Sequence, residues 1–440
     1  MFNLKLNRMK KITLSLAMVC IGVAMTAQTV TTNWSISNSS GNPPTLPDGG
    51  ATLLDNTTRN FAVGTVNGND RVFIVTRAGG TPKVLVYNSS DGNYVGSLPT
   101  GDVITTDATV KFAVNDGEVT EDGKLLVTNM VMPGNFKVYK WDNETSTPTV
   151  ALSYTFTSGR YGDNITISGN YTTGTAKVYA VNRVLGTTKV LCWSMMPDTS
   201  NPGSYIFNNT PTELFDVSAN NSNPTVGLRP DGGLYFKDGG LQIVKHSATG
   251  EVLSSSLASV VSFPGHTVRY IGTEGTDEYI AYFKYSLTAT TAETALERVD
   301  ILKVPDGDLS KAAVIATTPS LGFSANPNGS GDIVVRRVNK DVEIFAISAT
   351  NGFGKYTVKD VFTQTGIQNT ENNKIKIVFN SGILSVEGIN ATEIELYNTL
   401  GQIVKSQSDS NKMETGNLKG LFIVKVKADG KIVKTTKVII

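Results

Sequence analysis

Positively charged side chains stand directly after several short apolar segments, at the points where a loop would leave a strand. Six such segments recur along the chain, and five of them are followed within two residues by Lys or Arg. An Arg side chain presents a planar fork of N–H groups, which can hold a carboxylate or a sulfate through two parallel hydrogen bonds. The pattern predicts a ring of cations that binds an anionic group, with the members Arg77, Arg183, Lys237, Lys284, Arg336 and Arg337.

The loops that lead into the preceding strands add further polar groups to this predicted site. Arg59, Asn60 and Asn164 are assigned to it as ligand-binding residues, and Arg269 lies in a similar position. The structural alternative is that the cations pair with neighbouring carbonyl groups and acids, and so hold the strands together. Both interpretations stay open at this point.

Asp163 and His266 form a second candidate set, because a carboxylate and an imidazole can move a proton together in general acid–base catalysis. With the cations fixing a substrate carboxylate, they would make a hydrolase or lyase that acts on a carboxylated sugar or a lactone. The alternative, which we favour, is a surface or capping role for His266.

Other chemistry finds little support in the sequence. His246 and His266 are the only histidines, which excludes a multi-histidine metal site. The turns at 231–232 and 306–308 suggest Ca²⁺ only loosely, because hairpin turns use the same residues, and we expect no cofactor. A phosphate-binding Gly-rich loop, a nucleophile elbow and an HExxH helix are all missing from the sequence.

The charge is distributed unevenly along the 440 residues. The whole chain carries a net charge of +1, which argues against a protein that binds nucleic acid by neutralising phosphates. Residues 1–27 carry +4, residues 28–371 carry −7, and residues 372–440 carry +4. This shift predicts a domain boundary, with a polar linker at 363–373.

The N-terminus has the three parts of a secretory signal peptide. A basic stretch with Lys5 and Arg8 precedes the apolar segment 12–23, and small residues lead to a cleavage site after Ala27. A membrane anchor is the alternative, but the apolar segment is shorter than the ~20 residues needed to span a bilayer. Lipidation at Cys20 is disfavoured by the residues before it. We therefore expect residues 1–27 to direct export, and the mature chain to have no transmembrane segment.

Removal of that signal would leave Cys192 as the only cysteine, so the mature chain could form no intramolecular disulfide. We expect Cys192 to be a small buried apolar residue rather than a nucleophile.

The apolar segments repeat with a propeller-sized period. Their last apolar residues are separated by 52, 54, 55, 47 and 52 positions, and the sixth segment is 332–335. Each segment follows a Gly-, Asn- or Asp-rich turn and has shorter strands on either side, which gives four strands per repeat. The sequence predicts an all-β chain, with a six-bladed β-propeller in residues 28–362. We expect residues 30–36 to add an outer strand to the last blade. A pair of β-sandwiches is the alternative.

The tail, residues 374–440, resembles the C-terminal sorting domain of type IX secretion. Segments 394–404, 418–426 and 434–440 carry the resemblance, whereas residues 372–374 replace the family's usual Pro-Asn-Pro turn. The resemblance implies a small C-terminal β-sandwich, the type IX secretion machinery as a partner, and a final location outside the cell or on its surface.

The repeat region resembles an uncharacterised family of exported Bacteroidetes-type propellers, a domain of unknown function, through segments 58–64 and 71–84. A shorter similarity links residues 126–129 to a signature of lactonase-like propellers. The leading functional hypothesis is a propeller at the cell surface that binds an anionic glycan or a partner protein without catalysis. The hydrolase or lyase is the alternative hypothesis.

Overall fold

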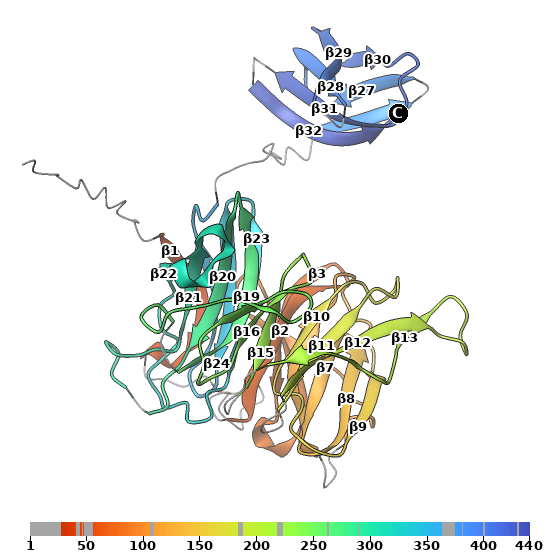
Figure 1. The fold of residues 1–440 in the computed structure, drawn as a ribbon. Coiled ribbons are helices and arrows are strands. Elements are labelled where there is room, and N and C mark those ends of the chain that lie inside the picture. Colours follow the sequence, from red (N-terminus) through yellow and green to blue (C-terminus); the bar gives the residue numbers. More distant parts are fainter. Residues whose placement is uncertain are drawn as a thin grey trace, which may run out of the picture. The chain divides into compact units, whose positions relative to one another are not determined.

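Antiparallel β-strands form almost all of the regular structure in the computed structural model (Figure 1). The structure describes residues 28–40, 45, 47, 56–105, 110–183, 188–217, 223–261, 264–288, 290–362, 375–380, 382–398, 401–428 and 431–440. The expected signal peptide at 1–27, with Cys20, and the expected linker at 363–373 lie outside these described residues. The chain divides into two compact units, Met1–Thr363 and Gln364–Ile440.

Six antiparallel sheets make up the described part of the first unit, and each sheet takes the name of its innermost strand. The β2 sheet contains β2 (Thr58–Val66), β3 (Asn69–Thr76), β4 (Lys83–Asn88) and β5 (Tyr94–Ser97). The β6 sheet contains β6 (Val110–Val119), β7 (Leu125–Val131), β8 (Gly134–Trp141) and β9 (Thr149–Phe156). The β10 sheet contains β10 (Ile165–Ser168), β11 (Lys177–Asn182), β12 (Lys189–Pro197), β13 (Tyr205–Phe207) and β14 (Thr212–Asp216).

The remaining three sheets follow the same plan. The β15 sheet contains β15 (Thr225–Leu228), β16 (Leu234–Lys237), β17 (Val244–His246) and β18 (Val252–Ser255). The β19 sheet contains β19 (Gly265–Glu274), β20 (Asp277–Lys284), β21 (Arg298–Val304) and β22 (Ala313–Thr317). The β23 sheet contains β23 (Gly331–Val338), β24 (Asp341–Ser348), β25 (Gly352–Val358) and β1 (Val30–Ser37). Short 3-10 turns lie at η1 (Asn38–Ser40), η2 (Ala78–Gly80), η3 (Pro305–Gly307) and η4 (Leu309–Lys311).

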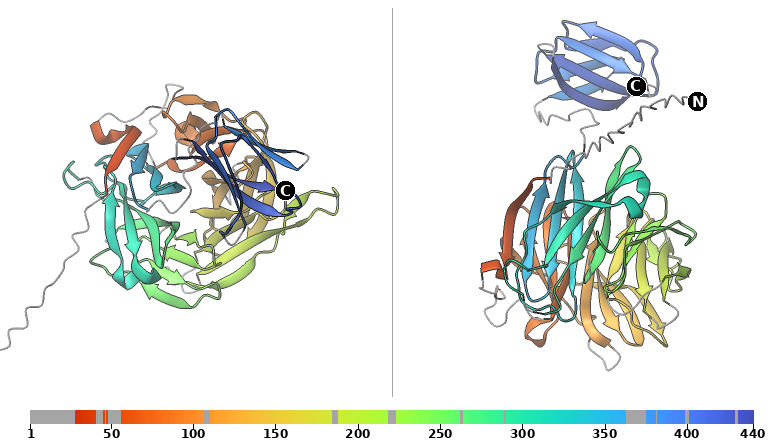
Figure 2. Two further views of the ribbon diagram at one scale, coloured as in Figure 1. Left: turned by 90° about the horizontal axis from the view of Figure 1, so that it is seen from above. Right: turned by 60° about the vertical axis from the view of Figure 1, so that its left-hand side comes forward.

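The sheets stand around a common centre, as the view from above shows (Figure 2, left). The innermost strand of each sheet contacts the innermost strand of the next sheet. The contact of β23 with β2 completes the ring. This is the arrangement of a β-propeller, and the prediction of an all-β propeller is confirmed at that level. No helix in the described ranges has both the length and the apolar character needed to span a bilayer.

Turn chemistry and burial explain why the sequence forms these sheets. Between β2 and β3, Asn67 and Gly68 both have positive φ, which a tight two-residue hairpin requires. In β3, the run from Val72 to Val75 is buried on both faces, because one face packs on the β6 sheet and the other on the β23 sheet. Each sheet therefore gains its core from its neighbours in the ring.

Strand β1 closes the ring, as expected for residues 30–36. It pairs with β25 from Val30↔Val358 to Ser37↔Gly352, so the N-terminal strand becomes the outermost strand of the β23 sheet. Trp34 packs edge-on against Phe353, and its indole N–H donates to the carbonyl of Ser89 in the β2 sheet, at 2.9 Å. One strand thus joins the last sheet to the first.

The sixth repeat differs from the sequence prediction. Residues 332–335 were expected in the second strand of their sheet, but they lie in β23, the innermost strand. The Asn- and Gly-rich stretch 326–331 has the composition of a hairpin turn, yet it is the loop that leads into β23. Arg336 and Arg337 consequently lie at the opposite end of the ring from the loops that follow the other second strands.

The C-terminal unit has two antiparallel sheets in its described residues. One contains β26 (Lys376–Asn380), β27 (Ile383–Glu387) and β30 (Lys412–Glu414). The other contains β28 (Glu393–Tyr397), β29 (Ile403–Ser408), β31 (Leu421–Ala428) and β32 (Lys431–Ile439). Buried residues of both sheets, such as Leu384 and Val424, belong to one hydrophobic cluster.

We predict that Trp34→Ala lowers the free energy of unfolding of the first unit by about 2 kcal/mol, because a half-buried indole and its hydrogen bond between two sheets are lost. Urea unfolding followed by circular dichroism measures this change. Thr31→Ala is the control, since Thr31 is an exposed residue of the same strand. An equal loss in both variants would show that Trp34 does not join the sheets.

Candidate functional site

A cavity of about 630 Å³ opens at the end of the ring where the innermost strands begin. It lies against residues at or before the starts of β2, β6, β10, β15 and β23, and just after β3, β7 and β11. We call it the cationic cavity. Its described lining is Asn56, Thr57, Arg59, Arg77, Lys111, Phe112, Met130, Met132, Arg160, Arg183, Asn223, Pro327 and Asn328.

Five of these lining residues carry a positive charge, and none is acidic or a histidine. They are Arg59, Arg77, Lys111, Arg160 and Arg183. For Lys111 and Arg183, no acidic partner lies within ion-pair distance in the part of the chain that the structure describes. The cavity therefore concentrates positive charge in a unit whose sequence is net negative.

Arg59 forms the floor of the cavity and is almost fully buried. Its Nε donates to Ser330 Oγ at 2.8 Å, and one terminal nitrogen donates to Asn223 Oδ1 at 3.3 Å. Burial lowers the pKa of the Arg59 guanidinium, and the Asp163 carboxylate opposes that shift. Guanidinium stays protonated in proteins, so Arg59 supplies a fixed charge below the cavity.

Arg160 and Arg183 come from two loops of the β10 sheet. Their backbones exchange two N–H···O bonds of 3.1 Å, which holds the loops side by side. The Arg160 side chain also pairs with Asp163 and donates to Asn223 Oδ1 at 3.2 Å. Asp163 therefore balances one cation of the cavity.

Phe112 provides an apolar surface among the charges. The Arg77 guanidinium lies 3.4 Å from the centre of the Phe112 ring, and that of Arg59 lies 5.5 Å from it. Such stacking orients a guanidinium, and one terminal nitrogen of Arg77 also donates to the carbonyl of Asn56 at 3.1 Å. Met132, 52% exposed, adds a flexible apolar side chain at the opening.

Three of the predicted ligand-binding residues meet in this cavity: the ring members Arg77 and Arg183, and Arg59 from the loop that leads into β2. Asn60 and Asn164 are buried beneath it. Asn60 Nδ2 donates to the carbonyls of Asn115 and Asp163, and Asn164 Nδ2 lies 3.4 Å from Asp116 Oδ2. These two amides connect neighbouring innermost strands, so their observed contacts are structural.

The prediction that Lys237 and Lys284 present their charges to a ligand is wrong. Lys237 is fully buried, and its ammonium donates to the carbonyls of Asp238, Leu241 and Gly265 at 2.5–2.8 Å. Burial lowers the pKa of Lys237 to about 7. Lys284 pairs with Asp300 in its own sheet, at 3.0 Å. Both lysines tie strands together.

Arg336 and Arg337 do not join the cavity either, because they follow the end of the innermost strand β23. Arg336 pairs with Asp70 at the start of β3, at 2.8 Å, and so links the last sheet to the first. Arg337 lies 3.7 Å from the centre of the Phe362 ring and donates to the carbonyl of Thr273.

The alternative catalytic pair, Asp163 and His266, is absent from the described lining of the cavity. His266 is buried, its Nδ1 lies 2.8 Å from Thr267 Oγ1, and its ring packs near Phe283 and Tyr285. Burial, with Lys237 and Arg59 nearby, lowers the pKa of His266 to about 3, so the ring is neutral. The expected surface position of His266 is therefore wrong as well.

In both turns that suggested calcium, an Asp side chain pairs with a basic residue. Asp306 pairs with Lys311 at 3.1 Å, and Asp231 pairs with Arg229 at 2.7 Å. Within the described ranges, no group of three His, Cys, Asp or Glu side chains has a geometry suited to a metal ion.

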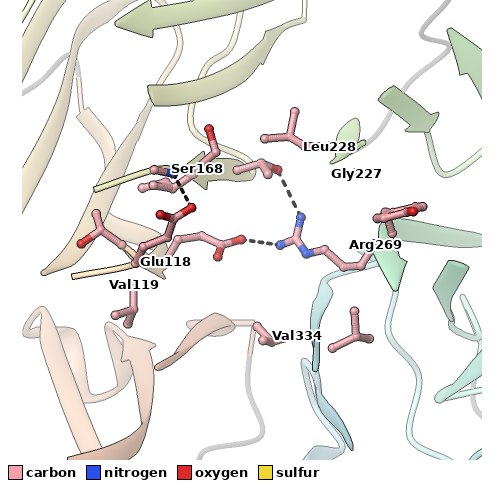
Figure 3. Close-up of a pocket in the computed structure, with 14 residues that line it drawn as sticks. Glu118, Val119, Ser168, Gly227, Leu228, Arg269 and Val334 are labelled. Carbon is pink, nitrogen blue, oxygen red and sulfur yellow. Dashed lines mark hydrogen bonds and ion pairs between the residues drawn. The ribbon is translucent and has the colours of Figure 1, made fainter. Parts of the chain in front are cut away.

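A buried ionic network fills the centre of the ring below the cationic cavity, and we call it the axial network. Arg269 on β19 donates to Glu118 on β6 at 2.8 Å and to Asp332 on β23 at 3.2 Å. It also reaches Thr166 Oγ1 on β10 at 3.2 Å and the carbonyl of Ile333 at 3.0 Å. Figure 3 shows Arg269 and Glu118 beside a second cavity, of about 280 Å³, toward the other end of the ring.

The carboxyl groups of the axial network hold protons more tightly than usual. Burial raises the pKa of Asp116, Glu118 and Asp332, and the nearness of Asp332 raises that of Asp116 further. Arg269 opposes these shifts, and the carboxylates in turn raise the pKa of its guanidinium. One guanidinium cannot neutralise three carboxylates, so protonation balances the remaining charge.

Lys111, Arg160 and Asn223 are three polar cavity residues that the sequence analysis missed. Each stands at or before the start of an innermost strand, the same position that singled out Arg59. A search of every repeat for polar residues at this position would find all three.

Comparisons with known proteins agree with the fold. No protein-family model matches the chain, and no curated protein matches it. Among solved structures, a DUF4623 family protein from Bacteroides eggerthii is 14% identical, with a TM-score of 0.54 over 70% of this chain and 71% of that one. At this identity the similarity shows a shared fold.

More distant matches cover most of their own chains. A DUF4221 family member from Bacteroides vulgatus is 8% identical, with a TM-score of 0.39 over 76% of this chain and 98% of that one. The fucose-recognising six-bladed β-propeller lectin of the fungus Aleuria aurantia is 12% identical, with a TM-score of 0.42 over 71% and 99%.

We predict that Asp332→Asn reduces the pH dependence of stability. The folded wild type keeps a proton on this carboxyl above pH 4, where the unfolded chain loses it. The protein therefore loses up to about 1.4 kcal/mol per pH unit as pH rises from about 4 to the raised folded pKa. Asn keeps the oxygen that accepts from Arg269 and does not titrate.

Urea unfolding at pH 5 and pH 8 measures the difference, with Asp91→Asn, an exposed carboxylate, as the control. A loss of stability between these pH values that is as large in Asp332→Asn as in the wild type would contradict the raised pKa.

Proposed function

We propose that this protein is a non-catalytic β-propeller that binds an anionic glycan in the cationic cavity. The observation that carries the proposal is the lining itself, in which all five charged residues described are Lys or Arg. A carboxylate or sulfate bound there gains charge-assisted hydrogen bonds from several guanidinium groups together. The volume of about 630 Å³ lies in the range of pockets that hold small ligands.

A glycan is favoured over a simple ion because the cavity also has apolar walls. The Phe112 ring and the Met130 and Met132 side chains lie beside the cations. The C–H groups of a sugar ring pack on such surfaces, while its acidic substituents reach Arg77 and Arg183. A free sulfate would use only the charged part of this lining.

The described lining contains no Asp, Glu or His side chain, which supports binding rather than catalysis. Hydrolase or lyase chemistry needs a group that accepts or donates a proton within hydrogen-bond reach of the substrate. His266 is buried and neutral, and Asp163 is held by Arg160, so neither serves as that group in the observed geometry.

We further propose that the six sheets form a six-bladed propeller, followed by a small C-terminal β-sandwich in residues 374–440. The signal-like N-terminus at 1–27 supports export, and the resemblance of the tail to sorting domains supports the type IX secretion machinery as the export partner. The proposed location is the cell surface or the extracellular space. An exported glycan-binding protein would meet its ligand there.

We predict that Arg183→Ala and Lys111→Ala each weaken binding of an anionic oligosaccharide by about tenfold, because each removes one charge-assisted bond. An array of sulfated and uronic-acid-containing oligosaccharides identifies a bound probe, and calorimetry with that probe gives the affinity. Binding should also weaken as salt is raised.

The control is Arg337→Ala, which removes an Arg from the opposite end of the ring. Equal losses in Arg337→Ala and Arg183→Ala would mean that net charge alone attracts the probe. No binding of any anionic glycan, with binding of an acidic peptide instead, would assign the cavity to a protein partner.

A further inference from the structure

A cavity of about 570 Å³ lies away from the ring axis, between the β6 and β10 sheets. We call it the peripheral cavity. It lies beside the ends of β8 and β10, the start of β9 and the hairpin between β12 and β13, which projects from its sheet (Figure 1). Its described lining is Lys124, Lys140, Asp142, Thr149, Val150, Ala151, Tyr171, Thr172, Asp198, Asn201, Gly203, Ser204, Tyr205 and Ile206.

The wall that carries Tyr171 is held in place by the neighbouring sheet. The Asp122 carboxylate accepts from the backbone N–H groups of Tyr171 and Thr172, at 2.8 and 2.9 Å, and from the Thr172 hydroxyl. Partial burial raises the pKa of Asp122, but these bonds outweigh it and lower the pKa to about 2. The carboxylate is therefore ionised and fixes this turn at any physiological pH.

The opposite wall is formed by the β12–β13 hairpin and is also ordered by local bonds. Asp198 N donates to Ser204 O at 2.9 Å, and the Asp198 carboxylate accepts from Ser200 N at 2.9 Å. The Tyr205 ring packs directly on Gly174, where a Cβ would stand only 2.2 Å from the ring. Gly174 has a φ of +72°, so a glycine is required there for both reasons.

The peripheral cavity contains two phenol groups. Tyr171 and Tyr205 both line it, and no hydrogen-bond partner is found for either hydroxyl among the described residues. A phenol hydroxyl both donates and accepts, which suits the hydroxyl groups of a ligand. Val150 and Ile206, each about 40% exposed, add apolar contact area beside the tyrosines.

The charges of the peripheral cavity balance, unlike those of the cationic cavity. Lys124 and Lys140 bind the Asp142 carboxylate at 3.1 and 3.0 Å, and Asp198 is the other acid. Two cations and two anions give no net attraction for a charged ligand. The Asp142 carboxylate and the Asn201 amide still have capacity to accept and donate to neighbouring hydroxyl groups.

We propose that the peripheral cavity is a second binding site, which takes an uncharged polyhydroxylated ligand of the neutral-oligosaccharide class. The tyrosine hydroxyls, Asp142 and Asn201 bind the sugar hydroxyls, and the Tyr205 ring with Val150 and Ile206 packs on the C–H face of the sugar. This site is independent of the anionic-glycan site, because the two cavities share no described lining residue.

The test uses the purified full chain and an array of neutral hexose and deoxyhexose oligosaccharides, followed by titration calorimetry with the neutral glycan that binds best. We expect Tyr205→Ala to weaken this binding at least tenfold and Asp142→Asn to weaken it about fivefold. Tyr205→Phe, which keeps the ring on Gly174 and removes only the hydroxyl, should show an intermediate loss and guards against a folding defect.

Two controls separate this proposal from the anionic-glycan site. Tyr94→Ala removes an exposed tyrosine from β5 and should leave neutral-glycan binding unchanged. Arg183→Ala should also leave it unchanged while weakening anionic probes. Failure of every neutral oligosaccharide to bind at millimolar concentration would overturn the proposal, as would wild-type affinity in both Tyr205→Ala and Asp142→Asn.

Discussion

The buried guanidinium of Arg269 is the interaction on which the ring depends. From β19 it reaches the innermost strands of four other sheets, through Glu118 on β6, Thr166 on β10, Val226 on β15 and Asp332 on β23. Removing one partner of a buried ion pair typically costs 3–5 kcal/mol, because the other charge stays buried and uncompensated. A single side chain thus joins five of the six sheets around the axis, its own and four others.

The two ends of the ring have different electrostatics, and the axial network lies between them. Above it, Arg59 and Arg160 share Asn223 Oδ1 and face a cavity with no acid in its described lining. Below it, Glu118 and Glu121 line the smaller axial cavity. Burial raises the pKa of the carboxyl groups in this network, and Glu118 and Asp332 pair with Arg269.

Local sequence patterns predicted much of this architecture, because the information needed was local. Each hairpin carries its own residues of positive φ, such as Asn67 and Gly68, and the period near 50 follows from four strands per sheet. The pairing of β1 with the last sheet was also predictable. The sequence prediction was wrong by one strand in the sixth repeat. Residues 326–331 have the composition of a hairpin turn but form the loop into β23. Composition does not distinguish these two roles; strand pairing does.

The sequence by itself determined the β-strand repeat, the charge of each region and the residue types available for binding an anion. Only the tertiary structure decided which cations meet. Arg59, Arg77 and Arg183 share a cavity with Lys111 and Arg160. The Lys237 ammonium instead donates its hydrogen bonds to the carbonyls of Asp238, Leu241 and Gly265. The physical reason is that the exposure and the partners of a charged side chain depend on how the sheets pack, as in the bond from Lys237 to Gly265, 28 positions away.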